Sequence, residues 1–162
     1  MKAEMNGLNE DIVKLLIRKN MTVAAAESCT GGLLAALLTN VSGASDVMNE
    51  SIVTYANAAK IKYLGVNEDT LSEYGAVSAE TAFAMARGLY DRTDANVTVG
   101  ITGIAGPGGG TAEKPVGLVY AGICINGNTE VLQMNHIGNR EEVREKTCIE
   151  VLKSLKEKLA VL

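Results

Sequence analysis

A serine and a cysteine stand side by side in residues 27–32, which read Glu-Ser-Cys-Thr-Gly-Gly. Residues 22–26 before them are typical of a short buried strand, and the apolar residues 33–38 after them are typical of a helix. A serine at such a strand-to-helix turn is placed like the nucleophile of α/β hydrolases, although the Gly-x-Ser-x-Gly motif is absent. Ser28 is therefore a candidate nucleophile for acyl transfer, and Cys29 is its competitor.

The same turn offers backbone N–H groups to an anionic group. Gly31 and Gly32 allow a ligand to approach the backbone closely, and the N–H groups at the start of a helix can bind a phosphate or stabilise an oxyanion. Thr30, Gly31 and Gly32 are therefore candidate substrate-binding residues. The alternative is that Ser28 or Thr30 only caps the helix and that the two glycines only pack.

A general base for the serine must be found elsewhere, because the chain contains a single histidine, His136. Tyr55 and Lys60 lie where a predicted strand at 51–55 passes into a predicted helix at 57–64. A lysine can act as a general base when desolvation lowers its pKa, and a tyrosine hydroxyl can relay a proton. A Ser-Lys-Tyr set would then replace a histidine-based one. The alternative is a solvated Lys60 and a Tyr55 without a role.

A glycine-rich segment, residues 102–110, follows another predicted strand at 97–101. So much glycine beyond a strand indicates a cradle that wraps a ligand, with Thr102, Gly103 and Gly106 as candidate contacts. The segment is not a Walker A sequence, and it lacks the helix that a dinucleotide-binding fingerprint requires. A flexible surface loop is the alternative.

Two arginines, Arg140 and Arg144, stand at the start of the last predicted helix, which Asn139 and Glu142 would begin with a capping box. An arginine at a helix N-terminus opposes the macrodipole, and an anion placed between them would relieve this opposition. Because the net charge of the chain is −4, an anionic ligand needs a dedicated cation. Arg140 and Arg144 are the candidates for it, and surface arginines without a role are the alternative.

The remaining pattern alternates strands with helices. Ser78 is expected to cap a helix, and Asn126-Gly127 predicts a hairpin between the strands 116–125 and 129–137. Three further groups of apolar residues have helical spacing, namely Leu8, Ile12, Leu15 and Leu16 near the N-terminus, then Ala82, Phe83, Ala86, Leu89 and Tyr90, and finally Cys148, Val151, Leu152, Leu155 and Leu159.

This order of elements predicts an α/β fold, a three-layer α/β/α sandwich with a mixed, mostly parallel sheet, as a single domain over residues 1–162. In such sheets, functional sites gather in the loops beyond the carboxyl ends of the strands. We therefore expect the loops 27–32, 55–60 and 102–110 to meet.

Composition narrows the classes of partner and compartment. A chain of pI near 5.1 is an unlikely nucleic-acid binder, and no apolar run is long enough to span a membrane. The N-terminus shows no signal-peptide pattern, and the three cysteines have neither zinc nor redox spacing. We expect a cytoplasmic protein that binds no metal, no nucleic acid and no membrane.

Taken together, the sequence resembles the CinA C-terminal family of nicotinamide-nucleotide amidohydrolases. The matching segments follow one another from about residue 8 to the C-terminus, and they are residues 26–32, 53–60, 75–78, 102–110, 113–117, 138–140 and 143–144. Two departures are present, since residues 56–60 read Ala-Asn-Ala-Ala-Lys where the family often has Ser-Asn-Glu-Ala-Lys, and His136 replaces a usual phenylalanine.

The resemblance implies hydrolysis of the carboxamide of nicotinamide mononucleotide to nicotinate mononucleotide and ammonia, in pyridine-nucleotide recycling. It places the family's catalytic serine, tyrosine and lysine on Ser28, Tyr55 and Lys60, and it implies no metal and no cofactor. It also implies a homo-oligomer, and a stand-alone form without the additional N-terminal domain of some members. The alternatives are a non-catalytic nucleotide sensor and an amidohydrolase for a different nucleotide or amide.

Overall fold

The computed structural model describes the backbone of residues 1–162 and all side chains except those of Lys2, Ala3 and Asn6. Five strands form one sheet in the order β2 (Met48–Val53), β1 (Val23–Glu27), β3 (Val97–Gly103), β4 (Leu118–Ile125) and β5 (Asn128–Asn135). β1 is parallel to β2 and to β3, whereas β4 is antiparallel to β3 and to β5. Only β4 therefore runs against the other four strands, which confirms a mixed, mostly parallel sheet.

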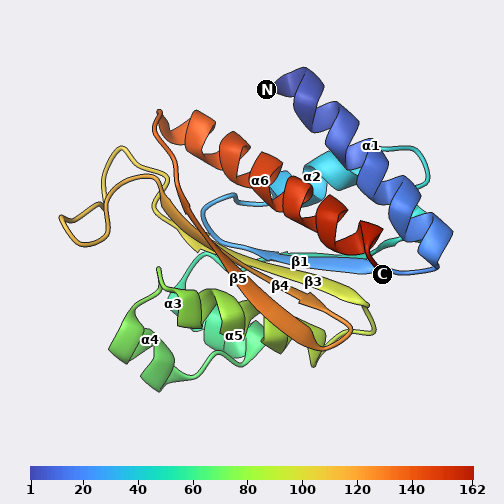
Figure 1. Ribbon diagram of the computed structural model, residues 1–162. Coiled ribbons are helices and arrows are strands. Elements are labelled where there is room, and N and C mark those ends of the chain that lie inside the picture. The colour runs from blue at the N-terminus through green and yellow to red at the C-terminus, as the bar shows by residue number, and fades with distance from the viewer.

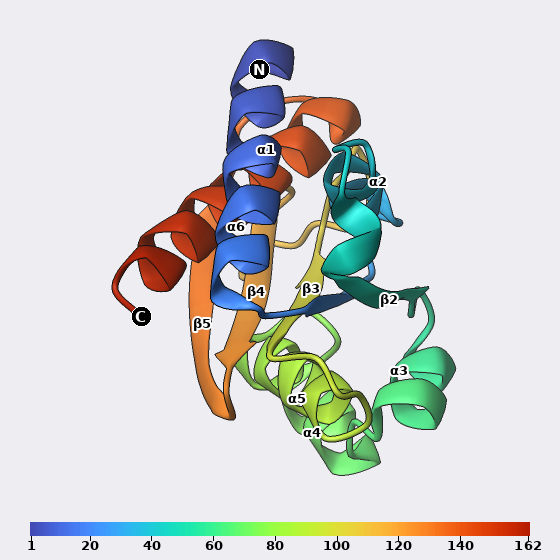
Figure 2. The ribbon, with the colours of Figure 1, turned by 90° about the vertical axis from the view of Figure 1, so that its right-hand side faces the viewer.

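Helices cover both faces of this sheet (Figure 1). On one face lie α1 (Lys2–Lys19), α2 (Leu33–Thr39) and α6 (Arg140–Ala160), with a short 3-10 helix, Ala44–Asp46, after α2. On the other face lie α3 (Asn57–Leu64), α4 (Glu68–Tyr74) and α5 (Ala79–Tyr90). Figure 2, viewed at a right angle, keeps α1 and α6 next to each other on their face. The predicted three-layer α/β/α sandwich is confirmed.

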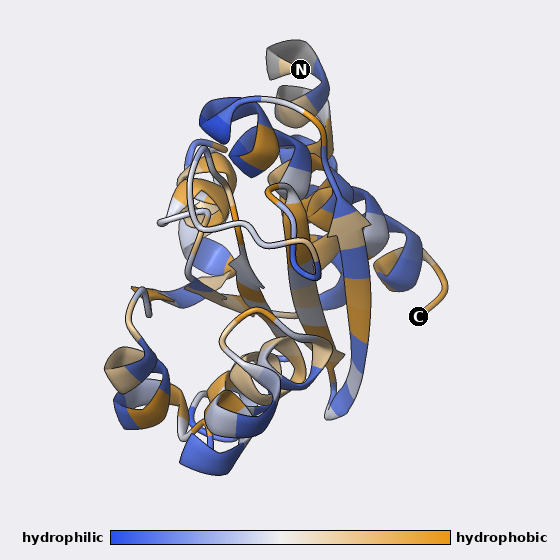
Figure 3. Cartoon of the chain, turned by 90° about the vertical axis from the view of Figure 1, so that its left-hand side faces the viewer, coloured by the Kyte–Doolittle hydropathy of each residue, from blue (hydrophilic) through white to orange (hydrophobic). Residues whose placement is uncertain are grey.

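The central strand β1 is buried along its whole length and serves both layers. Val23 and Ala25 belong to the larger core under α1, α2 and α6, while Ala24 and Ala26 belong to the smaller core under α5. This alternation follows from the two-residue period of a strand. In Figure 3 the hydrophobic residues accordingly concentrate on the middle strands and on the helix sides that face them.

Two glycines let α5 lie directly on the sheet. A Cβ at Gly100 would stand 2.5 Å from the Ala86 nitrogen, and one at Gly122 would stand 2.3 Å from the Ala82 oxygen. Because real Cβ atoms do not approach so closely, any larger residue at either position would push the helix away from the sheet.

Most predicted elements appear near their expected positions. The hairpin at Asn126-Gly127, the Ser78 cap of α5 and the capping box of Asn139 and Glu142 at α6 are confirmed. The strand expected at 51–55 begins and ends earlier, as β2, so that Tyr55 lies in the loop beyond it.

Two features of the α3–α5 layer differ from the sequence expectation. Helix α4 was not predicted, because its seven residues hold few apolar side chains, although Asn67 caps it by accepting a hydrogen bond from the Asp69 N–H. Phe83 was wrongly placed on the buried face of α5, since the residue is 45% exposed. Adjacent positions on a helix point about 100° apart, so Ala82 faces the sheet while Phe83 turns outward.

Among the described residues, no helix has the length and apolar character needed to cross a membrane.

Candidate active site

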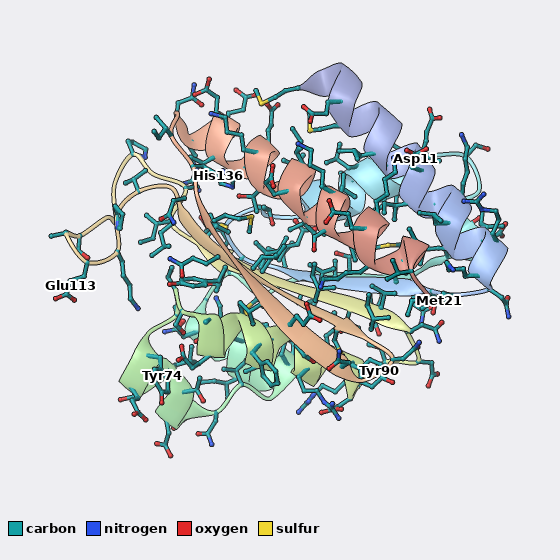
Figure 4. All side chains as sticks on the ribbon, in the orientation of Figure 1. Asp11, Met21, Tyr74, Tyr90, Glu113 and His136 are labelled. Carbon is teal, nitrogen blue, oxygen red and sulfur yellow. The ribbon has the colours of Figure 1, made fainter. Side chains whose placement is uncertain are left out.

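Three loops meet at the carboxyl ends of β1, β2 and β3, as predicted, and they enclose a cleft of about 280 Å³. Most of one wall comes from the glycine-rich loop after β3, whose continuation carries Glu113 at the tip of a protruding segment in Figure 4. The residues that line the cleft are Ser28, Cys29, Tyr55, Lys60, Ala76, Val77, Thr102, Gly103, Ile104, Ala105, Gly106, Gly108, Gly109 and Arg140.

Ser28 begins a tight turn that joins β1 to α2, which we call the serine turn (residues 28–31). The Ser28 N–H donates to the Ile101 oxygen of β3, and the Gly31 N–H donates to the Ser28 oxygen, so the turn is tied to the sheet and closed on itself. No other described residue accepts a hydrogen bond from the N–H of Cys29, the residue after the serine. This N–H is therefore available to a ligand.

A carboxylate already occupies the N-terminus of α2. Glu27 is fully buried, and its side chain accepts hydrogen bonds from the backbone N–H groups of Gly32, Leu34 and Ala35 at 3.1, 3.1 and 2.9 Å. The sequence suggested that N–H groups at the start of this helix bind a phosphate. In the structure these N–H groups donate to the Glu27 carboxylate instead.

Lys60 lies at the bottom of the cleft with only 1% of its surface exposed. Its Nζ is 3.2 Å from Ser28 Oγ, 2.9 Å from the Thr54 oxygen and 3.2 Å from the Tyr55 oxygen. Lys60 reaches this position because α3 begins directly after the loop at the end of β2, which brings the first turn of α3 beside the serine turn.

The partners of Lys60 are all uncharged oxygen atoms. Burial lowers the pKa of Lys60 below its ordinary value of 10.5, a shift that the neighbouring Cys29 opposes only in part, and no salt bridge of the described residues involves Lys60. A neutral amine has two N–H donors and one lone pair. In the structure Lys60 Nζ donates to Ser28 Oγ, and the Ser28 hydroxyl donates to the Tyr55 oxygen. When the amine is neutral, its two N–H groups serve the Thr54 and Tyr55 oxygens, which leaves the lone pair for the Ser28 hydroxyl proton.

The two other candidates for a nucleophile and a base are unfavourably placed. Burial raises the pKa of the Cys29 thiol to about 12, so at neutral pH it is protonated and a weak nucleophile. His136 does not line the cleft, and its backbone N–H donates to the Gly117 oxygen. Figure 4 shows it beyond the end of β5, near the start of α6.

Tyr55 and Arg140 form the outer edge of the cleft. Tyr55 is 59% exposed, and its hydroxyl accepts a hydrogen bond from Arg140 at 2.9 Å. Arg140 also donates to the Gly106 oxygen at 2.7 Å, which fixes the guanidinium between Tyr55 and the glycine-rich loop. The Tyr55 hydroxyl is bonded to neither Ser28 nor Lys60, and only its backbone oxygen contacts them.

The predicted site residues separate into two groups. All three catalytic candidates line the cleft together with four of the substrate-binding candidates, namely Thr102, Gly103, Gly106 and Arg140. The other four, Thr30, Gly31, Gly32 and Arg144, do not line it, and Arg144 instead donates to the Thr30 oxygen at 2.8 Å.

One part of the wall was not found from the sequence. Ala76 and Val77 line the cleft, and the Thr102 hydroxyl holds their segment by donating to the Ala76 oxygen at 2.6 Å. Small apolar residues between two helices carry no chemical signal of their own. Only the resemblance of residues 75–78 to the family pointed to this segment.

Within the part of the chain that the structure describes, the residues that line the cleft include basic types but no acidic ones. Among the described residues that line it, Lys60 and Arg140 are the only charged types, and no carboxylate is present. The described residues also contain no group of three His, Cys, Asp or Glu side chains arranged to hold a metal ion. The cleft therefore combines a hydroxyl and amine pair, an apolar wall and an outer cation, which suits a partly apolar anion with an electrophilic carbon.

Comparison with known proteins shows which family the chain belongs to. The family model of the CinA C-terminal domain matches residues 5–159. A competence-damage inducible protein of Clostridium perfringens strain SM101, so named provisionally, is 52% identical over 152 residues. A relative of the same provisional name in Clostridium novyi strain NT is 50% identical over 152 residues. Each alignment covers 94% of this chain but 37% of the relative, so the chain spans little more than a third of these curated relatives.

Solved structures agree over nearly the whole chain. The crystal structure of the competence/damage inducible protein CihA from Agrobacterium tumefaciens has a TM-score of 0.93 at 43% identity, covering 97% of this chain and 96% of that one. A CinA superfamily protein from Klebsiella pneumoniae has a TM-score of 0.94 at 31% identity, covering 98% and 99%.

Proposed function

Because the chain belongs to the CinA C-terminal domain family, we propose that it is a cytoplasmic amidohydrolase that converts nicotinamide mononucleotide to nicotinate mononucleotide and ammonia. The observation that carries this proposal is the contact of 3.2 Å between Ser28 Oγ and the buried amine of Lys60. A hydroxyl and a desolvated amine at this distance form a nucleophile and its base. The metal-independent Ser-Lys chemistry is part of the same proposal.

In the first half of the reaction, Ser28 Oγ attacks the carboxamide carbon while its proton passes to Lys60 Nζ. The Cys29 N–H, which has no partner among the described residues, is the candidate donor to the negative oxygen of the tetrahedral intermediate. When the carbon–nitrogen bond breaks, Lys60 returns the proton to the leaving nitrogen, which departs as ammonia. An ester between Ser28 and the nicotinoyl group remains.

In the second half, a water molecule attacks the ester carbon and gives a proton to Lys60. The ester bond to Ser28 Oγ then breaks, and Lys60 delivers that proton to the serine oxygen. The product acid ionises to the carboxylate, and the free enzyme is restored. Lys60 thus accepts and returns one proton in each half, so it must begin each half neutral.

The two ends of the substrate suit different parts of the cleft. Ala76, Val77 and Ala105 offer an apolar surface to the flat face of the pyridinium ring, and Arg140 at the outer edge offers a cation to the phosphate. The Tyr55 hydroxyl, bonded to Arg140, belongs to this outer end and acts there as an orienting group. The proton relay that the sequence suggested for Tyr55 stays a prediction beside this orienting role.

Ammonia release from nicotinamide mononucleotide by the purified chain tests the proposal. We expect Ser28→Ala to lower turnover by about 10³-fold or more, and Cys29→Ala to retain most of it. Hydroxylamine added during turnover should divert the ester to a hydroxamate. Tight binding without ammonia would favour the nucleotide sensor, and activity only on other amides or nucleotides would redirect the substrate assignment. The reverse pattern of the two variants would move the nucleophile to Cys29.

A further inference from the structure

Glu27 connects the nucleophile and the base through the backbone. Its side chain holds Gly32, Leu34 and Ala35 beyond the serine turn, as described above. Its own backbone oxygen accepts the Thr54 N–H at 2.9 Å, and the Thr54 oxygen in turn accepts a hydrogen bond from Lys60 at 2.9 Å. One fully buried residue therefore fixes the strand end that carries Ser28, the helix start that follows it, and the segment that anchors Lys60.

Arg144 holds the same turn from the opposite side. It lies on α6, more than a hundred residues later in the chain, and its guanidinium donates to the Thr30 oxygen at 2.8 Å. The same nitrogen stands 3.6 Å from the place that a Cβ of Gly31 would take, so it packs over the turn. Gly31 has a φ of +58°, a conformation that favours glycine, and the bond from Arg144 secures the turn at this point.

We propose that Glu27 and Arg144 are positioning residues. Glu27 holds the helix start that follows the serine turn by its N–H groups, Arg144 holds the turn itself by the Thr30 oxygen, and together they keep Ser28 Oγ within reach of Lys60. The inference deepens the proposed function and rests on it. Neither side chain lines the cleft, so neither would touch the substrate. The two arginines therefore have different roles, because Arg140 lines the cleft and Arg144 does not, although the sequence analysis proposed both as phosphate-binding residues.

The expected kinetic effect is a loss of turnover at unchanged substrate binding. A misplacement of a reacting group by about 1 Å can lower a rate by about 10²-fold. For Arg144→Gln and Glu27→Gln we expect kcat to fall by about 10- to 100-fold while KM for nicotinamide mononucleotide stays within about threefold. Arg144→Lys keeps a cationic donor for the single bond to Thr30 and should recover most of the lost kcat.

A second measurement is independent of the substrate. A fluorophosphonate reacts with an activated serine hydroxyl, and mass spectrometry reports the rate at which Ser28 is labelled. We expect labelling in the two Gln variants to slow in proportion to the loss of kcat. If the native chain is labelled at Ser28 but releases no ammonia, the proposed function fails, and slowed labelling of the variants would still support the positioning role.

Two control substitutions make the same chemical changes at exposed positions. Glu157→Gln on α6 and Arg18→Gln on α1 should leave kcat and labelling unchanged. Circular dichroism and thermal unfolding show whether each variant is folded, and Arg144→Gln decides the question if Glu27→Gln does not fold. Native kcat and labelling in the folded variants would overturn the proposal. So would a raised KM for nicotinamide mononucleotide in Arg144→Gln at native kcat, because Arg144 would then bind the substrate.

Discussion

Lys60 illustrates how a single residue type acquires a chemical role from its surroundings. On an exposed helix it would be a solvated cation with a pKa near 10.4. Here it is buried, it faces two carbonyl oxygens and a hydroxyl, and burial holds its pKa below the ordinary value. The surroundings of Lys60 therefore favour the transfer of a proton from Ser28 to its amine.

The first prediction concerns Lys60 as the base. Activity should rise with pH as Lys60 loses its proton, and the midpoint should lie below 10.5 because burial lowers this pKa. Lys60→Arg should lower kcat by at least about 10²-fold, because a guanidinium stays charged and cannot accept the proton. The check is a profile of kcat/KM against pH for both proteins, with folding monitored by circular dichroism.

His136→Ala is the control for this prediction, because His136 does not line the cleft. It should retain most activity and the same pH profile. Normal turnover in Lys60→Arg, together with loss of activity in His136→Ala, would show that the base is the histidine.

The second prediction concerns Arg140 as the cation for the phosphate. Arg140→Ala removes a charge-assisted contact and should weaken the binding of nicotinamide mononucleotide by about 1.5 kcal/mol, which raises its Kd roughly tenfold. Nicotinamide riboside lacks the phosphate, so its binding affinity should fall much less in this variant. Calorimetric titration of both ligands, with Ser28→Ala in the background to prevent turnover, provides the measurement. Equal losses for the two ligands would exclude Arg140 from phosphate recognition.

At the scale of elements, α6 carries the outer part of the site. Asn139 and Glu142 form its capping box, with the Glu142 N–H donating to Asn139 Oδ1 at 3.0 Å and the Asn139 N–H donating to Glu142 Oε2 at 2.7 Å. Arg140 is the first residue of the helix, directly after this cap. The order of the first turn thus controls where the guanidinium lies.

The third prediction follows from this arrangement. Asn139→Ala removes the cap and should lower the free energy of unfolding by about 1 kcal/mol. Because Arg140 then sits on a frayed turn, KM for nicotinamide mononucleotide should rise while kcat changes little. Urea unfolding and steady-state kinetics measure the two effects.

A matched control is Asn67→Ala, which removes the cap of α4. It should cost a similar amount of stability and leave KM unchanged, because no residue of α4 lines the cleft. A rise of KM in both variants would mean that general loosening, and not the start of α6, affects substrate binding.

At the scale of the whole molecule, the buried lysine links catalysis to folding. In the unfolded chain Lys60 has an ordinary pKa, whereas in the folded chain burial lowers it. Between these two pKa values the unfolded chain binds more protons than the folded one, so stability rises with pH across this window. The burial of Lys60 therefore lowers the stability of the folded chain at neutral pH, and the same burial makes the amine easier to deprotonate.

The fourth prediction uses this linkage. Lys60→Met replaces the amine with an apolar side chain and should remove its contribution to the pH dependence of stability. The stability of Lys60→Met relative to the native chain should be most favourable at low pH and should decline as pH rises toward about 10. Urea unfolding over this range measures it. Lys62→Met, an exposed lysine of the same helix, should show no such trend, and parallel curves for Lys60→Met and the native chain would contradict the prediction.

The sequence by itself determined most of the elements, with the exception of α4, and the chemical types at the site. The Asn126-Gly127 hairpin and the caps at Ser78 and Asn139 are local signals, and each was confirmed. The motifs of the sequence also indicated the family. The meeting of the three loops at the cleft was predicted because the carboxyl ends of parallel strands gather at one edge of a sheet. That Ser28, Tyr55 and Lys60 carry out catalysis stays a prediction.

Only the tertiary structure decided which groups touch. It showed that Glu27 occupies the start of α2, that Arg140 and not Arg144 lines the cleft, and that the Tyr55 hydroxyl faces Arg140. It also revealed the wall of Ala76 and Val77. These facts depend on burial and on contacts between residues far apart in the chain. Local patterns do not encode either, because the direction and partners of a polar side chain are set when distant elements pack together.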